Sequence, residues 1–138
     1  MKIAEVKTKQ DKKEFIDFAK DLYKTDPFWV CQLDSVIESV FDPVKNHNFK
    51  HGEATRWILK DDDNYTIGRI AAFIDKVRSS ANRQPTGGIG FFEVVEDKEA
   101  AFILFNTALE LHRFNGMEAM DGPINFGENY NNLGLLVE

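Results

Sequence analysis

The stretch that decides the fold is residues 89–116, which read IGFFEVVEDKEAAFILFNTALELHRFNG. Its first part, 89–95, is a near-continuous apolar run typical of a strand buried on both faces. Residues 97–114 repeat apolar side chains at helical spacing and end before Gly116, which suits the position after a helix. Residues 117–123 follow as the next strand. Because strand–helix–strand connections are right-handed, we expect 117–123 to lie parallel to 89–95.

The residues before this unit predict an antiparallel meander. Residues 2–7 alternate like a short strand, and residues 11–23 have the i, i+3, i+4, i+7 spacing of an amphipathic helix. Residues 53–60 and 65–77 flank an acidic turn and predict a β-hairpin, followed by a polar loop over 78–87. The order β-α-α-β-β-β-α-β predicts an α+β fold: a mixed sheet of an antiparallel meander plus one parallel βαβ unit, with helices on both faces.

A shorter helix is expected over residues 34–41. Ser35 and Glu38 stand at capping-box spacing at its start. The aromatic cluster Phe28-Trp29-Val30 before it follows a proline. It reads as a plug of the core or, alternatively, as the lining of an acceptor pocket.

The chain ends on an apolar stretch, residues 133–137. We therefore expect residues 1–138 to be a single domain that forms the N-terminal portion of a longer protein, with a fold incomplete at its C-terminus. The alternative is a compact α+β domain whose last strand ends the chain. An uncovered C-terminal strand region would favour a homo-oligomer.

The composition argues against several classes of function. The 138 residues contain 17 Lys+Arg and 23 Asp+Glu, a formal net charge of −6, so nucleic acid is not an expected partner. No apolar run is long enough to span a bilayer, and we expect neither a membrane segment nor a signal peptide. The single cysteine, Cys31, fits a reducing compartment, and we expect a cytoplasmic protein. The 12 phenylalanines need a large core, a pocket or a partner surface.

Five stretches spread along the chain resemble the GNAT superfamily of acyl-CoA N-acyltransferases, in a mostly uncharacterised bacterial branch. They are 23–30 (YKTDPFWV), 68–72 (GRIAA), 90–93 (GFFE), 122–125 (GPIN) and 134–137 (GLLV). The resemblance implies the GNAT-like fold. It also implies acyl transfer from acetyl-CoA or another acyl-CoA to the amine of a small molecule or peptide.

In GNAT proteins the equivalent of strand 89–95 splays from its parallel neighbour, and the pantetheine arm of CoA pairs with the exposed strand edge. The diphosphate sits at the start of the following helix, where free N–H groups and the helix dipole favour an anion. By this resemblance the cofactor-binding residues are Val94, Val95, Lys98, Ala100 and Asn125. For Asn125, the alternative is a residue tolerated in a turn after Gly122-Pro123.

Glu93 follows two phenylalanines on the central strand, where many GNAT enzymes carry the general base that takes a proton from the amine. The resemblance makes Glu93 the candidate catalytic residue. The alternatives are an outward-facing side chain or an ion pair with Arg69 on the neighbouring strand. Arg69 itself reads as a bidentate anion ligand or as a surface ion pair.

The start of the helix departs from the basic, glycine-rich loop of the family. Residues 95–101 contain Glu96, Asp97, Glu99 and one lysine, but no glycine. A carboxylate ~8 Å from a phosphate charge costs about 2 kcal/mol at an effective dielectric constant of about 20, whereas a helix terminus returns about 0.3–1 kcal/mol. Repulsion exceeds attraction unless the carboxylates point away. The alternative interpretation is that Asp97 and Glu99 only cap the helix.

Three function classes follow. The first is an N-acyltransferase domain, incomplete in this chain, and the second is a degenerate GNAT-like scaffold without catalysis. The third is a protein-interaction module that uses exposed phenylalanines. Cys31 as a nucleophile and His47 with His51 as an i, i+4 metal pair are weaker candidates. No histidine is adjacent to the cysteine in sequence, and the Gly52 and Asn-rich context of the two histidines is typical of a loop instead of a helix.

Overall fold

The computed structural model describes residues 1–77, 84–124 and 126. In chain order, its elements are β1 (Lys2–Glu5), α1 (Lys9–Leu22), α2 (Asp34–Val40), the 3₁₀ helix η1 (His47–Lys50), β2 (Gly52–Lys60), β3 (Thr66–Asp75), β4 (Thr86–Val94), α4 (Lys98–Phe114) and β5 (Ala119–Asp121). The strand order is β1-β2-β3-β4-β5. The first four strands are antiparallel neighbours, and β5 is parallel to β4. The predicted α+β fold with a mixed sheet is confirmed, although β4 begins inside the segment predicted as a loop.

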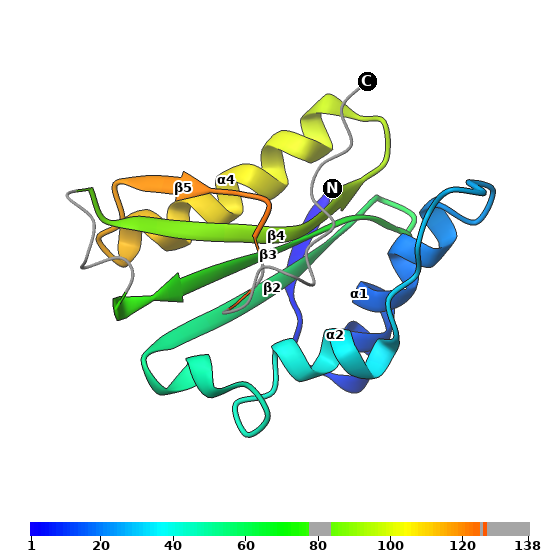
Figure 1. Ribbon diagram of the computed structural model, residues 1–138. Coiled ribbons are helices and arrows are strands. Elements are labelled where there is room, and N and C mark those ends of the chain that lie inside the picture. Colours follow the sequence, from blue (N-terminus) through cyan, green and yellow to red (C-terminus); the bar gives the residue numbers. More distant parts are fainter. Residues whose placement is uncertain (78–83, 125, 127–138) are drawn as a thin grey trace.

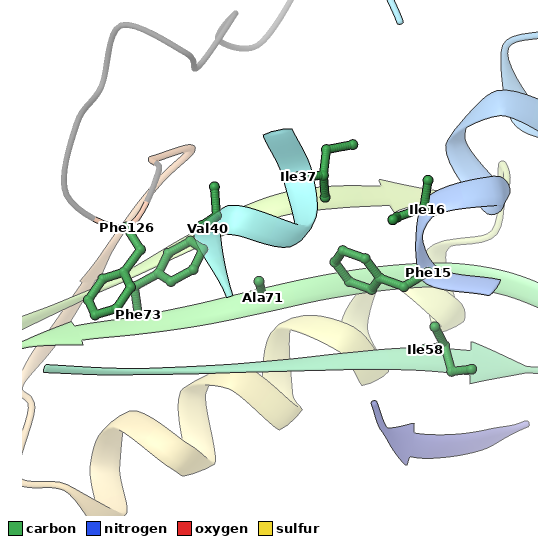
Figure 2. Close-up of a cluster of buried hydrophobic side chains, with 8 residues drawn as sticks. All are labelled: Phe15, Ile16, Ile37, Val40, Ile58, Ala71, Phe73 and Phe126. Carbon is green, nitrogen blue, oxygen red and sulfur yellow. The ribbon is translucent and has the colours of Figure 1, made fainter. Parts of the chain in front are cut away.

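The sheet separates two helical layers (Figure 1): α1 and α2 cover one face, and α4 covers the other, as predicted. The core on the α1 face is rich in aromatic rings, and Figure 2 shows its buried members: Phe15, Ile16, Ile37, Val40, Ile58, Ala71, Phe73 and Phe126. Within it, Phe73 stacks on Phe126 with ring centroids 5.5 Å apart. On the other face, Leu104 of α4 is fully buried against the sheet. In the described part of the chain, every helix is too short or too polar to cross a membrane.

Local signals define the start of α1. Thr8 Oγ1 accepts a hydrogen bond from the backbone N–H of Asp11 (3.0 Å), and the Asp11 carboxylate accepts one from the N–H of Thr8 (3.0 Å). This reciprocal capping box satisfies two backbone donors that a helix end leaves free. The buried stripe that follows, including Phe15 and Ala19, holds α1 against the sheet.

The predicted capping box of Ser35 and Glu38 is wrong. The residue before α2, Leu33, makes no side-chain cap, and the Glu38 carboxylate instead accepts two hydrogen bonds from the Arg56 guanidinium on β2 (2.9 and 3.0 Å). Arg56 is only 5% exposed and lies 4.2 Å from the centre of the Phe41 ring. A buried cation left without its carboxylate costs about 3–5 kcal/mol, whereas a lost cap costs about 1 kcal/mol, so the ion pair takes precedence.

The interpretation of Phe28-Trp29-Val30 as a core plug is also wrong. Phe28 and Val30 are 89% and 63% exposed. Trp29 is half-buried and stacks on Tyr23, with ring centroids 5.3 Å apart and an interplanar angle of 23°. The segment therefore packs against the end of α1 instead of entering the core.

Candidate functional site

Strand β4 contains one extra residue opposite β3. Arg69 pairs with Glu93 and Ala71 with Gly90, so between these pairs the chain advances two residues on β3 and three on β4. Phe91 lies in this interval with φ +53°, in the left-handed region that residues with a Cβ rarely adopt. The additional residue is a β-bulge. Because it shifts the alternation along β4 by one position, the backbone groups after it face the opposite edge of the strand from the one they would otherwise face.

The parallel pairing of β4 with β5 ends shortly before the bulge. It covers three register pairs and stops at Gly88 and Asp121, after which the N–H of Ile124 donates to the carbonyl of Ile89 (2.9 Å). A Cβ on Gly90 would come within 2.0 Å of the Ile124 carbonyl oxygen, so only glycine allows this close approach. The chain after β5 therefore stays beside β4 as far as Gly90.

Beyond Gly90, one edge of β4 has no partner strand among the residues that the structure describes. The N–H of Val95 donates to the carbonyl of Ile67 (3.0 Å), which lies on the β3 side. Because backbone groups alternate between the two edges of a strand, those of Phe92 and Val94 face the opposite edge, away from β3. No residue in the described ranges pairs with this edge at 92–94. We call it the open edge of β4.

The side chain of Glu93 lies on the α1 face beside this edge. The hydroxyl of Tyr23, the residue that caps the C-terminus of α1, donates a hydrogen bond to Glu93 Oε2. Burial, together with the Glu93 hydrogen bond, raises the pKa of Tyr23 to about 12. The phenol is therefore protonated at neutral pH and acts as a hydrogen-bond donor to the carboxylate.

Arg69, the cross-strand neighbour of Glu93, is 5% exposed. Its Nη1 donates to the carbonyl of Phe15 (2.7 Å) and its Nε to that of Phe91 (3.1 Å). Burial lowers the pKa of Arg69 to about 10, while the Glu93 carboxylate opposes this by favouring the charged form. The interpretation of Arg69 as a surface ion pair is thus wrong, because the guanidinium is buried. Within the described residues it donates to main-chain carbonyls and forms no ion pair.

These three side chains place a carboxylate beside an unpaired strand edge. One oxygen of Glu93 is held by Tyr23, and the described residues provide no donor for the other. Arg69 contributes a buried positive charge on the neighbouring strand. Chemically, the arrangement can accept a proton at Glu93 while the open edge holds an extended, amide-containing ligand by strand-like hydrogen bonds.

The start of α4 does not fit a diphosphate. Asp97 is the N-cap, and its Oδ1 accepts hydrogen bonds from the N–H groups of Glu99 (3.0 Å) and Ala100 (3.2 Å). The Lys98 ammonium lies 5.7 Å from the centre of the Phe102 ring, and Glu96 and Glu99 are exposed on either side. Two of the donors that could take a phosphate are thus occupied by a carboxylate, and the capping role of Asp97 is confirmed.

The other predicted cofactor residues divide between the two edges of β4. Val94 lies on the open edge, whereas the N–H of Val95 is occupied by Ile67 on the β3 side. Asn125 lies outside the described residues. Tyr23 was not predicted as a site residue, although it lies in a stretch, 23–30, that resembles the family. Only that resemblance could have drawn attention to it. Trp29, which the sequence offered as a core plug or as the lining of an acceptor pocket, stacks on Tyr23.

A shallow groove of about 530 Å³ lies along the outer side of α1, lined in part by Glu14, Asp17, Tyr65 and Val95. Tyr23, Glu93 and Arg69 are not among its lining residues. Glu14 is paired with Lys60 (3.0 Å) and Asp17 with Lys13, so these carboxylates already have cations. The groove nevertheless reaches Val95, the residue directly after the open edge of β4.

The remaining sequence candidates do not gather into a site. Cys31 is exposed, with its Sγ 3.4 Å from the carbonyl of the adjacent Gln32. His47 and His51 are exposed at the two ends of η1. Within residues 1–77, 84–124 and 126, no three side chains of His, Cys, Asp or Glu are arranged to hold a metal ion.

The architecture is that of the GNAT acetyltransferases. It superposes on a GNAT-family acetyltransferase from Staphylococcus aureus with a TM-score of 0.59 and 14% identity, covering 89% of this chain and 72% of that one. Glucosamine-6-phosphate N-acetyltransferase from Arabidopsis thaliana gives a TM-score of 0.56 at 14% identity, covering 89% and 82%. Ribosomal-protein-alanine N-acetyltransferase from Brucella melitensis gives 0.54 at 13% identity, covering 89% and 81%. The chain therefore has a GNAT-like fold, as its sequence motifs predicted.

Among curated proteins, Protein YghO of Escherichia coli K12 is 29% identical to the chain over 130 residues. The match takes in 94% of this chain and 33% of that protein. The chain thus spans about a third of the length of this relative. No protein-family model matches the chain.

Proposed function

We propose that the chain belongs to an N-acyltransferase and supplies its thioester-binding edge and its proton acceptor. In such a reaction the amine nitrogen bonds to the acyl carbon, the carbon–sulfur bond breaks, and the amine loses a proton. The observation that carries the proposal is the open edge of β4 directly beside Glu93. The GNAT-like fold supports it.

Each residue of the site has a role in this proposal. The open edge at Phe92 and Val94 would pair with the amides of a pantetheine-type arm, and Glu93 takes the proton of the amine. Tyr23 orients that carboxylate through one oxygen, which leaves the other toward the reacting amine. Arg69 is a positioning residue, because it binds the carbonyls of Phe15 and Phe91 on either side of the site.

The resemblance makes acetyl-CoA or another acyl-CoA the expected donor. Because Asp97 occupies two N–H groups at the start of α4, the diphosphate of such a donor has no free place there. That misfit also favours the second candidate function, a GNAT-like scaffold without catalysis. The two differ in whether the chain binds an acyl thioester and transfers its acyl group to an amine.

Nuclear magnetic resonance of the chain with acetyl-pantetheine tests the proposal. We expect saturable changes in the amide signals of Phe92 and Val94, with Val95 as an internal control because its N–H is already bonded to Ile67. If binding is found, acetyl transfer to a panel of amines should fall by about 100-fold in Glu93→Gln. Exposed Glu53 on β2 provides the matched control, Glu53→Gln. Unchanged spectra would favour the scaffold function.

A further inference from the structure

The first turn of α4 already contains an anion, and that anion belongs to the chain. The Asp97 carboxylate accepts the N–H groups of Glu99 and Ala100, and the Asp97 carbonyl accepts the N–H of Ala101 (3.1 Å). The N–H of Asp97 donates to the carbonyl of Val95 (2.6 Å). A helix N-terminus attracts anions through such free donors and its dipole, and here most of them are taken.

The charges around Asp97 also disfavour an anionic ligand at the start of α4. Glu96 and Glu99 are exposed next to Asp97, while Lys98, the one lysine of residues 95–101, lies over the ring of Phe102. A ligand that extends from the open edge of β4 toward α4 meets these three carboxylates directly after Val94. A neutral ligand end is tolerated there, whereas a multiply charged end is repelled.

We propose that this chain selects a pantetheine-type thioester without a nucleotide diphosphate, and that Asp97 excludes the diphosphate by occupying its place at the start of α4. The inference rests on the proposed function, because it assumes that the open edge of β4 binds the arm. The shared chemistry is an acyl thioester on an amide-containing arm. Its sources are a free pantetheine thioester or an arm that ends in a single phosphate.

Calorimetric titration with acetyl-pantetheine, acetyl-4′-phosphopantetheine and acetyl-CoA separates these ligands by charge. In the unmodified chain we expect affinity to fall along this series, with at least a roughly tenfold difference between its ends. In Asp97→Gly, which frees the N–H groups of Glu99 and Ala100 and removes the charge at little cost to the helix, affinity for acetyl-CoA should rise about tenfold while that for acetyl-pantetheine is unchanged. Glu110→Gln removes one exposed carboxylate farther along α4 and should change neither.

The outcomes separate the selection against a diphosphate from the proposed function itself. Equal or tighter binding of acetyl-CoA than of acetyl-pantetheine by the unmodified chain overturns the exclusion by Asp97 and leaves the proposed function standing. The same holds if Asp97→Gly raises the affinity for both ligands equally. If no variant binds any thioester, the proposed function is overturned, and with it the selection against a diphosphate. If acetyl-4′-phosphopantetheine binds as tightly as acetyl-pantetheine, an arm that ends in a single phosphate is the source. If it binds more weakly, the source is a free pantetheine thioester.

Discussion

The hydroxyl of Tyr23, at the end of α1, donates a hydrogen bond to the carboxylate of Glu93 on β4, 70 positions later in the chain. The bond joins the helical layer to the strand segment directly after the β-bulge. It holds the candidate base by one oxygen and raises the pKa of the phenol. The ionisation of Tyr23 therefore reports on the geometry of the site.

Replacing Glu93 with glutamine should lower the pKa of Tyr23 from about 12 part of the way toward 10.0, since burial, the larger cause, remains. Ultraviolet titration of phenolate formation, with pH jumps, measures the shift. Because the folded pKa lies above the unfolded one, the stability that this phenol contributes is complete below pH 10 and is lost as the pH rises toward 12. Glu53→Gln is the control, and an unchanged Tyr23 transition in Glu93→Gln would contradict the hydrogen bond.

Replacing Arg69 with methionine should reduce the free energy of unfolding by about 2 kcal/mol or more, because the carbonyls of Phe15 and Phe91 lose their donors inside the protein. Urea denaturation measures the change. Arg113→Met, at an exposed position of α4, should change stability by less than about 0.5 kcal/mol. Equal effects of the two substitutions would show that Arg69 is not a positioning residue.

At the bulge residue Phe91 we expect a glycine variant to be more stable than an alanine variant, the reverse of the usual order in a strand. Phe91→Gly should be more stable than Phe91→Ala by about 1 kcal/mol, because glycine adopts a φ of +53° without the Cβ repulsion. At Glu53, an ordinary strand position, glycine should be less stable than alanine by about 0.5–1 kcal/mol. Chemical denaturation of the four variants measures their free energies of unfolding. If alanine is more stable than glycine at both positions, the result argues against the left-handed conformation of Phe91.

His112 should make the protein sensitive to acid. It is 1% exposed, its Nε2 lies 2.9 Å from the carbonyl oxygen of Gly88, and its Nδ1 has no partner within the described residues. Burial lowers its pKa below 6.5. The unfolded chain therefore takes up a proton at a higher pH than the folded one, and stability falls as the pH drops below 6.5.

Unfolding free energies at about pH 7 and about pH 5 test this expectation. His112→Gln keeps a donor for Gly88 but does not titrate, so it should lose less stability between the two pH values than the unmodified chain. The exposed His51 gives the control, His51→Gln. A pH dependence that is the same in all three proteins would contradict the role of His112.

Local sequence patterns were sufficient to predict α4 and its N-cap, Asp97. The apolar repeat of 97–114 and the carboxylate at its start act within one or two helical turns, so the sequence alone predicted both. The same kind of reasoning failed at Glu38, where the spacing to Ser35 is right for a capping box but Arg56, from a distant strand, takes the carboxylate. It also failed at Phe28, because an apolar residue type does not show whether the fold leaves a place for it.

By itself, the sequence determined the order of elements, the mixed sheet and the capping of α4 by Asp97, since each depends on neighbours along the chain. Only the tertiary structure decided that Tyr23 meets Glu93, that Arg69 is buried between main-chain carbonyls, and that β4 carries a bulge beside an open edge. These features depend on the register of β4 against β3 and on where the end of α1 comes to lie. Both are set by how the two faces of the sheet pack, which no local spacing encodes.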